Sequence, residues 1–328
     1  MRLSDLLGTN SGLSQAQAKV NEELERQVAE RIKKAKASGK AGDFEKFGKA
    51  YFDSPTKFAH DCIMWPEGEA PTFYQDEIWD SIPTLERVAV RGPHGLGKSC
   101  LCSISILWFG LTREALSLDW KLPVTASVGN QLKNYLWPEV KKWSRRIDWK
   151  KIGRPAFNSR NELLTLELHQ TFGQAFCVAP EEPAKIEGAH ADHLYFCYDE
   201  AKIIPTGIWD AAEGAFSGAG KDTGRYAFAL AISTPGEPTG RFYEIHQQSK
   251  GMKAWTPRHV KVEDAIKAGR ISAEWVELMK LQWGEKSALY QQKVLGNFAS
   301  SDADSIIPLE WVEAAAHRFE SRTLQAEA

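Results

Sequence analysis

A short glycine-rich segment has the residue types and spacing needed to bind a polyphosphate. Residues 92–99 read GPHGLGKS and match the pattern G-x-x-x-x-G-K-[ST]. The glycines allow the backbone to curl, so that successive N–H groups point at a β-phosphate. We expect Lys98 to reach the β- and γ-phosphates and Ser99 to hold Mg²⁺, the alternative being a turn with an exposed lysine. The predicted nucleotide-binding residues here are Gly92, Pro93, His94, Gly95, Leu96, Gly97, Lys98, Ser99 and Cys100.

Two adjacent acidic residues follow an apolar run later in the chain. Residues 193–198 (HLYFCY) predict a buried strand, and Asp199 and Glu200 come directly after it. At the end of such a strand the first carboxylate can order Mg²⁺, and the second can polarise an attacking water. We therefore assign Asp199 to the metal and Glu200 to the catalytic general base. Solvated acids at a strand end are the alternative, so this interpretation depends on the phosphate loop.

The elements around these residues alternate between short apolar runs and amphipathic segments. Strands are predicted at 87–90, 123–126, 193–198 and 226–232, and helices at 99–111 and 131–146. This alternation indicates an α/β fold with a mostly parallel, helix-covered central sheet, whose active site lies at the carboxyl ends of the strands. With the phosphate loop it predicts a P-loop NTPase of the additional-strand, RecA-like or helicase-like type. A carboxylate directly after Asp199 favours hydrolysis by water over transfer to a hydroxyl.

Three parts of the chain are predicted. Residues 1–44 form an N-terminal helical arm, residues 45–300 form the ATPase domain, and residues 301–328 form a linker and a last amphipathic helix. The 41 Lys and Arg against 43 Asp and Glu give a net charge of −2, so any contact with nucleic acid must come from local basic faces. Five cysteines without a CxxC pair, and no apolar run long enough for a signal peptide or a membrane span, predict an intracellular protein.

Five segments of the chain resemble one family, the large subunits of phage terminases. They are FYQDEIWDSI (73–82), RVAVRGPHGLGKS (87–99), VTASVGNQLKNYLWPEVKKW (124–143), IEGAHADHLYFCYDEAKIIP (186–205) and AISTPGEPTGRFYEIH (231–246), in the family's order and spacing. The resemblance implies a bacteriophage motor that uses ATP and Mg²⁺ to translocate double-stranded DNA into a procapsid. It further implies a portal protein, a small terminase subunit and other copies of the chain as partners, in the host cytoplasm.

The resemblance also implies roles for single residues. Gln75 matches the glutamine that contacts adenine, although it could be a surface polar residue. Ser233 and Thr234 match a coupling motif in which a hydroxyl senses the γ-phosphate; the alternative is a strand end turned by the following Pro-Gly.

The source of a catalytic positive charge is left open by the sequence. His94 stands where several terminases carry an arginine, and imidazole is mostly neutral at pH 7. Arg91 could replace that arginine, or it could be a salt-bridged strand end. A neighbouring subunit is the other source, with Lys185, Arg160 and Arg225 as candidates.

Two further segments have more than one interpretation. The basic residues and tryptophans of 141–151 could contact DNA phosphates or form a solvated helix face. Residues 304–319 resemble the approach to the RNase H-like nuclease domain that terminases usually carry. Because the sequence stops at residue 328, we expect no nuclease site in this chain, which is either truncated or an ATPase-only relative.

Two other classes of function compete with the packaging motor. One is a helicase-like or other nucleic-acid-remodelling ATPase. The other is a nucleotide-binding assembly module that does not turn ATP over.

Overall fold

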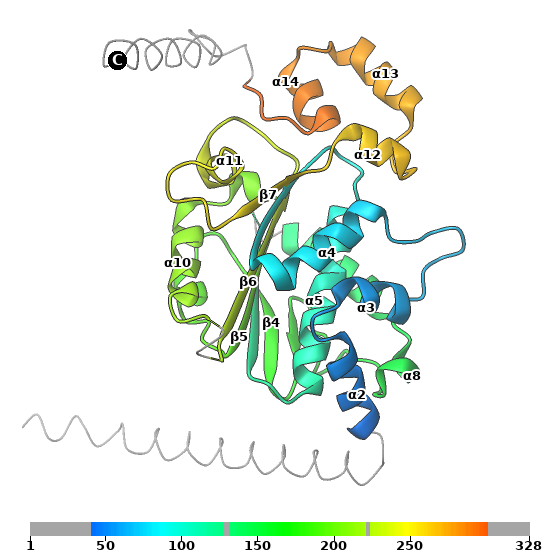
Figure 1. The fold of residues 1–328 in the computed structure, drawn as a ribbon, viewed down its shortest axis with the longest axis vertical. Coiled ribbons are helices and arrows are strands. Elements are labelled where there is room, and N and C mark those ends of the chain that lie inside the picture. Colours follow the sequence, from blue (N-terminus) through cyan, green and yellow to red (C-terminus); the bar gives the residue numbers. More distant parts are fainter. Residues whose placement is uncertain (1–40, 127–130, 221–223, 301–328) are drawn as a thin grey trace, which may run out of the picture.

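The computed structural model describes residues 41–126, 131–220 and 224–300, which form a central sheet with helices on both faces (Figure 1). In these residues the sheet has seven strands in the order β3-β4-β2-β5-β6-β1-β7. All neighbouring strands are parallel except β3 and β4. The strands are β1 Arg87–Arg91, β2 Trp120–Thr125, β3 Glu167–His169, β4 Gly173–Val178, β5 His193–Asp199, β6 Tyr226–Ser233 and β7 Thr256–His259.

The helices form two layers and a separate group at the carboxyl edge of the sheet. In Figure 1 helices α2 to α5 lie on one face, α10 and α11 on the other, and α12 to α14 above the upper edge. Their bounds are α2 Ala41–Tyr51, α3 Pro55–Cys62, α4 Phe73–Leu85, α5 Lys98–Ala115, α7 Trp137–Ser144, α8 Trp149–Ile152, α9 Pro183–Glu187, α10 Thr206–Phe216, α11 Gly240–His246, α12 Val262–Lys267, α13 Ala273–Trp283 and α14 Ala288–Tyr290. Short turns of other helical types are η2 Leu132–Leu136, η3 Ala201–Ile203 and η4 Gln291–Leu295. Among the described residues, none of these helices has both the length and the apolar character that crossing a bilayer requires.

The alternation of side chains along the strands divides the core into two apolar clusters. On β1, Val88 and Val90 belong to the cluster that contains α5, whereas Ala89 belongs to the cluster that contains α10. Both faces of the sheet are therefore buried from solvent. This explains why the central strands β5 and β6 are nearly continuous apolar runs and do not alternate between apolar and polar residues. This arrangement leaves the carboxyl edge of the sheet as the place for polar side chains.

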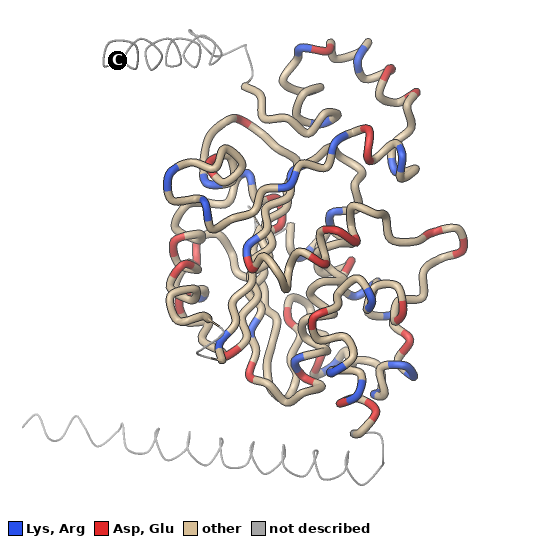
Figure 2. The backbone as a smooth tube through the Cα atoms, in the orientation of Figure 1, with Lys and Arg blue, Asp and Glu red and all other residues tan. Residues whose placement is uncertain are grey.

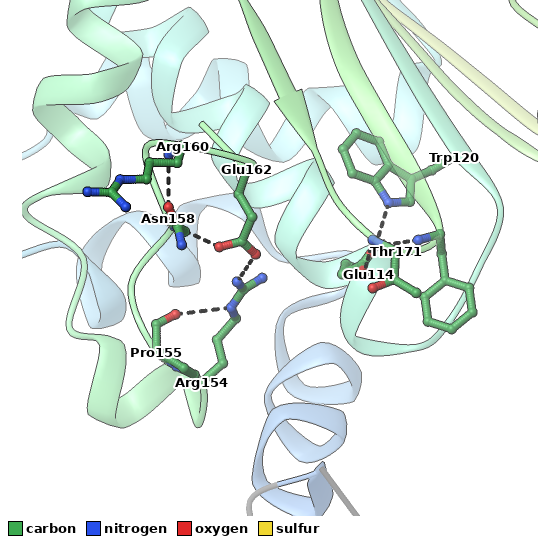
Figure 3. A network of polar contacts seen from close by, with 9 residues as sticks. Glu114, Trp120, Arg154, Pro155, Asn158, Arg160, Glu162 and Thr171 are labelled. Atoms are coloured by element: carbon green, nitrogen blue, oxygen red, sulfur yellow. Dashed lines mark hydrogen bonds and ion pairs between the residues drawn. The ribbon is translucent and has the colours of Figure 1, made fainter. Parts of the chain in front are cut away.

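A buried carboxylate attaches the β3–β4 edge of the sheet to the end of α5. Glu114 accepts hydrogen bonds from the backbone N–H groups of Thr171 (2.8 Å) and Phe172 (3.0 Å) and from the indole of Trp120 (3.3 Å), as Figure 3 shows. Burial raises the pKa of Glu114, and the three donors oppose that shift. The contact closes the base of the domain, at the opposite end of α5 from the phosphate loop.

The predicted fold class is confirmed. One strand, β6, lies between β5 and β1, which is the arrangement that defines an additional-strand sheet. The four predicted strands and two predicted helices all exist, the second helix being divided between η2 and α7. The predicted arm ends at residue 44, within α2, and residues 1–40 and 301–328 lie outside the described part of the chain.

Candidate active site

The phosphate loop connects β1 to α5 and has the curled backbone that its sequence predicts. Gly95 and Gly97 have φ angles of +86° and +77°, in the left-handed region that glycine adopts without strain. A Cβ atom on Gly97 would lie 2.9 Å from the side-chain nitrogen of Gln75. The loop therefore depends on glycine for both its conformation and its packing.

Lys98 begins α5 and is held in the loop by neutral oxygens. Its ammonium donates to the carbonyl of Pro93 at 2.8 Å and to the hydroxyl of Thr234 at 2.9 Å. Burial lowers the pKa of Lys98 to about 8, and the charges of Glu200 and Asp199 oppose that shift. A buried ammonium whose hydrogen-bond partners are uncharged is well placed to receive an anion.

The acidic pair lies at the end of β5, and Glu200, but not Asp199, lines the cleft that contains the loop. Asp199 is buried, and desolvation followed by the charge of Glu200 raises its pKa to about 7. Glu200 has a left-handed φ of +49°, which turns its side chain out of the strand and into the cleft. Its carboxylate accepts a hydrogen bond of 2.9 Å from the hydroxyl of Ser233, the last residue of the neighbouring strand β6.

Most of the predicted site residues surround one cleft of about 640 Å³. Of the predicted set, Gln75, His94, Gly95, Leu96, Gly97, Lys98, Ser99, Cys100 and Glu200 line it. Gly92 and Pro93 form the start of the loop. Ser233 contacts Glu200, and Thr234 contacts Lys98. The two signatures that lie about 100 residues apart in the sequence therefore meet at one site.

Gln75 reaches the cleft but already uses both ends of its amide. The oxygen accepts the backbone N–H of Thr72 in a capping box at the start of α4, and the nitrogen donates to the carbonyl of Gly97 at 3.4 Å. Gln75 thus connects α4 to the phosphate loop. The amide oxygen keeps a second lone pair and the nitrogen a second hydrogen, so contact with an adenine base does not require either hydrogen bond to break.

Neither candidate for a catalytic cation on the loop itself has the position or charge for that role. Burial, followed by the charges of Lys293 and Lys98, lowers the pKa of His94 to about 4, so the imidazole is neutral. Arg91 does not line the cleft: its guanidinium donates to the carbonyl of Gly296 at 3.0 Å and lies 5.3 Å from the ring of Phe298. The arrangement therefore argues against the prediction of Arg91 as a catalytic residue and gives it a role in attaching the C-terminal segment.

Several residues of the cleft were missed by the sequence analysis. Arg270, between α12 and α13, lies across the loop, with its guanidinium nitrogen 3.4 Å from the position of a Cβ on Gly97. Trp65 and Tyr135 form part of the opposite wall, and Tyr135 is 68% exposed. No local motif marks these positions, because they meet the loop only through the tertiary fold.

In the basic segment 141–151, Trp143 is buried and Trp149 is half-buried. Trp143 is buried and donates to Glu139 at 3.0 Å, while Trp149 donates to the carbonyl of Ser144. Lys142 pairs with Glu139 and lines the cleft. Basic and acidic residues are interspersed along the described backbone (Figure 2).

The three candidates for a charge supplied to a neighbouring subunit lie away from this cleft. Lys185 pairs with Glu182 at 2.7 Å, and Arg225 approaches Asp192 at 3.7 Å. Arg160 lies in the loop before β3 and donates its backbone N–H to Asn158.

The strand order, the loop after β1 and the acidic pair after β5 define an α/β P-loop NTPase. No protein-family model matches the sequence. The chain is 25% identical over 267 residues to the probable large terminase subunit of Enterobacteria phage P7, a match that covers 76% of this chain and 50% of that protein. The chain thus spans half the length of this curated relative.

Solved structures with a similar fold are large terminases. The ATPase domain of the Thermus phage P74-26 large terminase has a TM-score of 0.53 at 19% identity, covering 71% of this chain and 95% of that chain. The large terminase of bacteriophage HK97 has a TM-score of 0.53 at 12% identity, covering 75% and 55%. A large terminase of a thermophilic bacteriophage in complex with ADP has a TM-score of 0.50 at 16% identity, covering 69% and 52%. The fold of this chain is therefore that of a large terminase ATPase domain, as the resemblance in sequence implied.

Proposed function

We propose that this chain is the ATP-hydrolysing motor of a phage DNA-packaging terminase, which translocates double-stranded DNA into a procapsid. The observation that carries the proposal is that Glu200 and Lys98 line one cleft, in a fold shared with large terminase ATPase domains. The similarity to the phage P7 protein supports the same conclusion. The proposal assigns ATP hydrolysis, and not DNA cleavage, to these residues.

The loop residues bind the triphosphate. The backbone N–H groups of 95–100 and the start of α5 would surround the β-phosphate. Lys98 would exchange its hydrogen bonds to Pro93 and Thr234 for the β- and γ-phosphate oxygens. Because the ammonium is buried, its attraction to phosphate is weakened little by solvent.

Ser99 and Asp199 could supply two oxygen ligands to a magnesium ion whose other ligands include phosphate oxygens. Mg²⁺ takes oxygen ligands and often only one or two from the protein. In the described part of the chain no three His, Cys, Asp or Glu side chains gather to hold a metal ion, so phosphate oxygens and water would complete the ligand shell. Burial and the charge of Glu200 raise the pKa of Asp199, and a bound cation would favour its ionised form. When bound, the ion would neutralise charge on the phosphate oxygens.

Glu200 activates the water. The water oxygen attacks the γ-phosphorus as Glu200 accepts a proton, and the bond from the γ-phosphorus to the β–γ bridging oxygen breaks. The products are ADP and inorganic phosphate. The hydrogen bond from Ser233 holds one carboxylate oxygen, which leaves the other free to accept the proton.

Ser233 and Thr234 connect the two halves of the site. These neighbours contact Glu200 and Lys98 respectively, so a shift of either partner is passed to the end of β6. We propose this pair as the coupling element between nucleotide state and movement. The proposed partners of the motor are double-stranded DNA, a portal protein, a small terminase subunit and further copies of this chain in a ring. The proposed location is the host cytoplasm.

The rate of ATP hydrolysis with and without duplex DNA tests the proposal. We expect stimulation of the parent protein by DNA and loss of turnover in Lys98→Ala, while Lys286→Ala, an exposed lysine outside the cleft, keeps the parent rate. Turnover that is indifferent to duplex DNA but drives strand separation on a forked substrate would favour a helicase-like ATPase. Nucleotide binding without turnover would favour an assembly module.

A further inference from the structure

The turn between α12 and α13 packs directly on the glycines of the phosphate loop. A Cβ atom on Gly95 would lie 3.5 Å from Cγ1 of Ile271 and 3.8 Å from the carbonyl oxygen of Arg270. A Cβ atom on Gly97 would lie 3.4 Å from a terminal guanidinium nitrogen of Arg270. The side chain of Arg270 therefore extends along the loop, from Gly95 toward the start of α5.

The amide of Gln75 meets the loop at the same glycine. Its nitrogen lies 2.9 Å from the Cβ position of Gly97 and donates to the Gly97 carbonyl. The amide of Gln75 and the guanidinium of Arg270 thus both lie within 3.4 Å of one point, and both residues line the cleft. Two planar polar groups from distant segments therefore lie together at the end of the loop.

The guanidinium of Arg270 has no partner within the described protein. In residues 41–126, 131–220 and 224–300, no hydrogen bond within 3.5 Å and no ion pair within 4.0 Å involves this group. The amide of Gln75 keeps one N–H and one oxygen lone pair beyond the hydrogen bonds that it makes. Both side chains can therefore contact a ligand without losing an existing contact.

These two side chains mark a different part of the cleft from the residues of the γ-phosphate end. That end is defined by Lys98 and Glu200, whose side chains hydrogen-bond to the residues at the end of β6. Arg270 makes no such contact and lies beside Gln75, which belongs to α4. The position of Arg270 therefore suits the nucleoside of a bound nucleotide better than its terminal phosphate.

The cleft also has an aromatic lining, which suits a planar base. Trp65, Tyr135 and Trp143 line it, and the rings of Trp65 and Trp143 lie 4.7 Å apart. A base can pack on such rings, whereas phosphate oxygens gain little from them. The cleft can therefore hold a base as well as the phosphates that the loop would bind.

We propose that the guanidinium of Arg270 packs on one face of the adenine base of bound ATP, while the amide of Gln75 contacts the edge of the base. The inference rests on the proposed ATPase function and deepens it by naming the residue that holds the nucleoside. A guanidinium is planar and stacks on aromatic rings, and its positive charge is attracted to their faces. Because the backbone of Arg270 lies on Gly95, a bound base also holds the turn between α12 and α13 against the loop.

Affinities for ligands with and without a base test this assignment. The ligands are ADP, the slowly hydrolysed analogue ATPγS and inorganic tripolyphosphate, which has the phosphates alone. Arg270→Ala should bind ADP and ATPγS about tenfold more weakly, the loss expected for one stacked contact, while its affinity for tripolyphosphate changes less than about twofold. Retained binding of tripolyphosphate shows in the same titration that the loop is intact and the variant is folded. Arg258→Ala, at an exposed arginine of β7 outside the cleft, should match the parent with all three ligands.

The lysine variant separates stacking from a contact with phosphate. Arg270→Lys keeps the charge but loses the planar group, so it should recover little of the lost affinity for ADP. Recovery to nearly the parent affinity would overturn the assignment, because a phosphate contact needs only the charge. Equal weakening of tripolyphosphate and ATPγS in Arg270→Ala, or no change in any affinity, would overturn it as well.

Turnover gives an independent readout. A contact with the base is made equally in the ground state and in the transition state, so Arg270→Ala should raise KM for ATP by about tenfold with kcat within about twofold of the parent. A fall in kcat with KM unchanged would contradict the assignment and place Arg270 at the reacting phosphate.

Failure of the proposed function gives a different result. A parent protein that binds ADP and ATPγS without hydrolysing ATP would refute the ATPase function, and the binding titrations would still decide the role of Arg270. A parent protein that binds neither nucleotide would refute both.

Discussion

Replacing Asp199 with Asn should stabilise the nucleotide-free protein while removing its activity. Asp199 is 7% exposed, and burial followed by the charge of Glu200 raises its pKa from 3.8 to about 7. Both causes penalise the ionised carboxylate. An amide of nearly the same shape carries no charge, and its oxygen can still accept the backbone N–H of Glu200.

The sign of the pH dependence follows from the raised pKa. The folded protein holds the Asp199 proton more tightly than the unfolded chain, so this stability is complete below pH 3.8 and is lost as the pH rises through about 7. The difference between the two pKa values corresponds to roughly 4 kcal/mol, at about 1.36 kcal/mol per pKa unit. The advantage of Asp199→Asn should therefore grow between pH 4 and pH 8, by up to about this amount, and then level off.

Denaturant unfolding at two pH values measures the effect. The parent, Asp199→Asn and Asp80→Asn proteins would be compared at pH 5 and pH 8. Nucleotide and divalent metal would be left out, because their binding would stabilise the folded protein with an ionised Asp199. Asp80 is an exposed carboxylate on α4 and serves as the matched control. We expect the gap between Asp199→Asn and the parent to widen by about 2.6 kcal/mol from pH 5 to pH 8, with no such widening for Asp80→Asn. A gap that is independent of pH, or an Asn variant less stable than the parent at pH 8, would refute the reasoning.

Three further experiments test the roles of single residues. Glu200→Gln should lower single-turnover hydrolysis by roughly a hundredfold or more with ATPγS affinity unchanged, because only the proton acceptor is lost, and hydrolysis at the parent rate would remove Glu200 from that role. Ser233→Ala should lower kcat by about tenfold with little change in KM, since the hydroxyl holds Glu200 at 2.9 Å, and an effect on KM alone would contradict this. ADP affinity should fall as the pH rises above about 8, where the ammonium of Lys98 loses its proton, and the dependence should disappear in Lys98→Gln. An affinity of the parent protein that stays constant from pH 7 to pH 10 would show that the charge of Lys98 does not attract the phosphates.

The parts of the site that were predictable are those in which function depends on neighbouring residues in the chain. The phosphate loop requires glycines at fixed offsets from Lys98, and the acidic pair must follow an apolar strand, so both leave local patterns. The central strands were predictable for a related reason. Because both faces of β5 and β6 are buried, their sequences are continuous apolar runs.

The parts that were not predictable depend on contacts between distant segments. β7 reads TPRH, contains a proline, and is an edge strand whose pairing with β1 is set by the tertiary fold. The side chain of Arg270 and the backbone of Lys293 meet the loop from positions about 170 and about 200 residues later in the sequence, and nothing in their local sequence distinguishes them from surface cations. Arg91 shows the opposite case, since closeness to the loop in sequence suggested a role that its side-chain direction does not support.

Gly296 lies directly against the phosphate loop, since a Cβ atom there would lie 2.8 Å from the Cα of Gly92. Residue 300, where the described chain ends, is four residues after Gly296 and so lies within about 14 Å of that contact, at about 3.5 Å per residue. A movement of the phosphate loop is therefore transmitted directly to residues 296–300 through this contact.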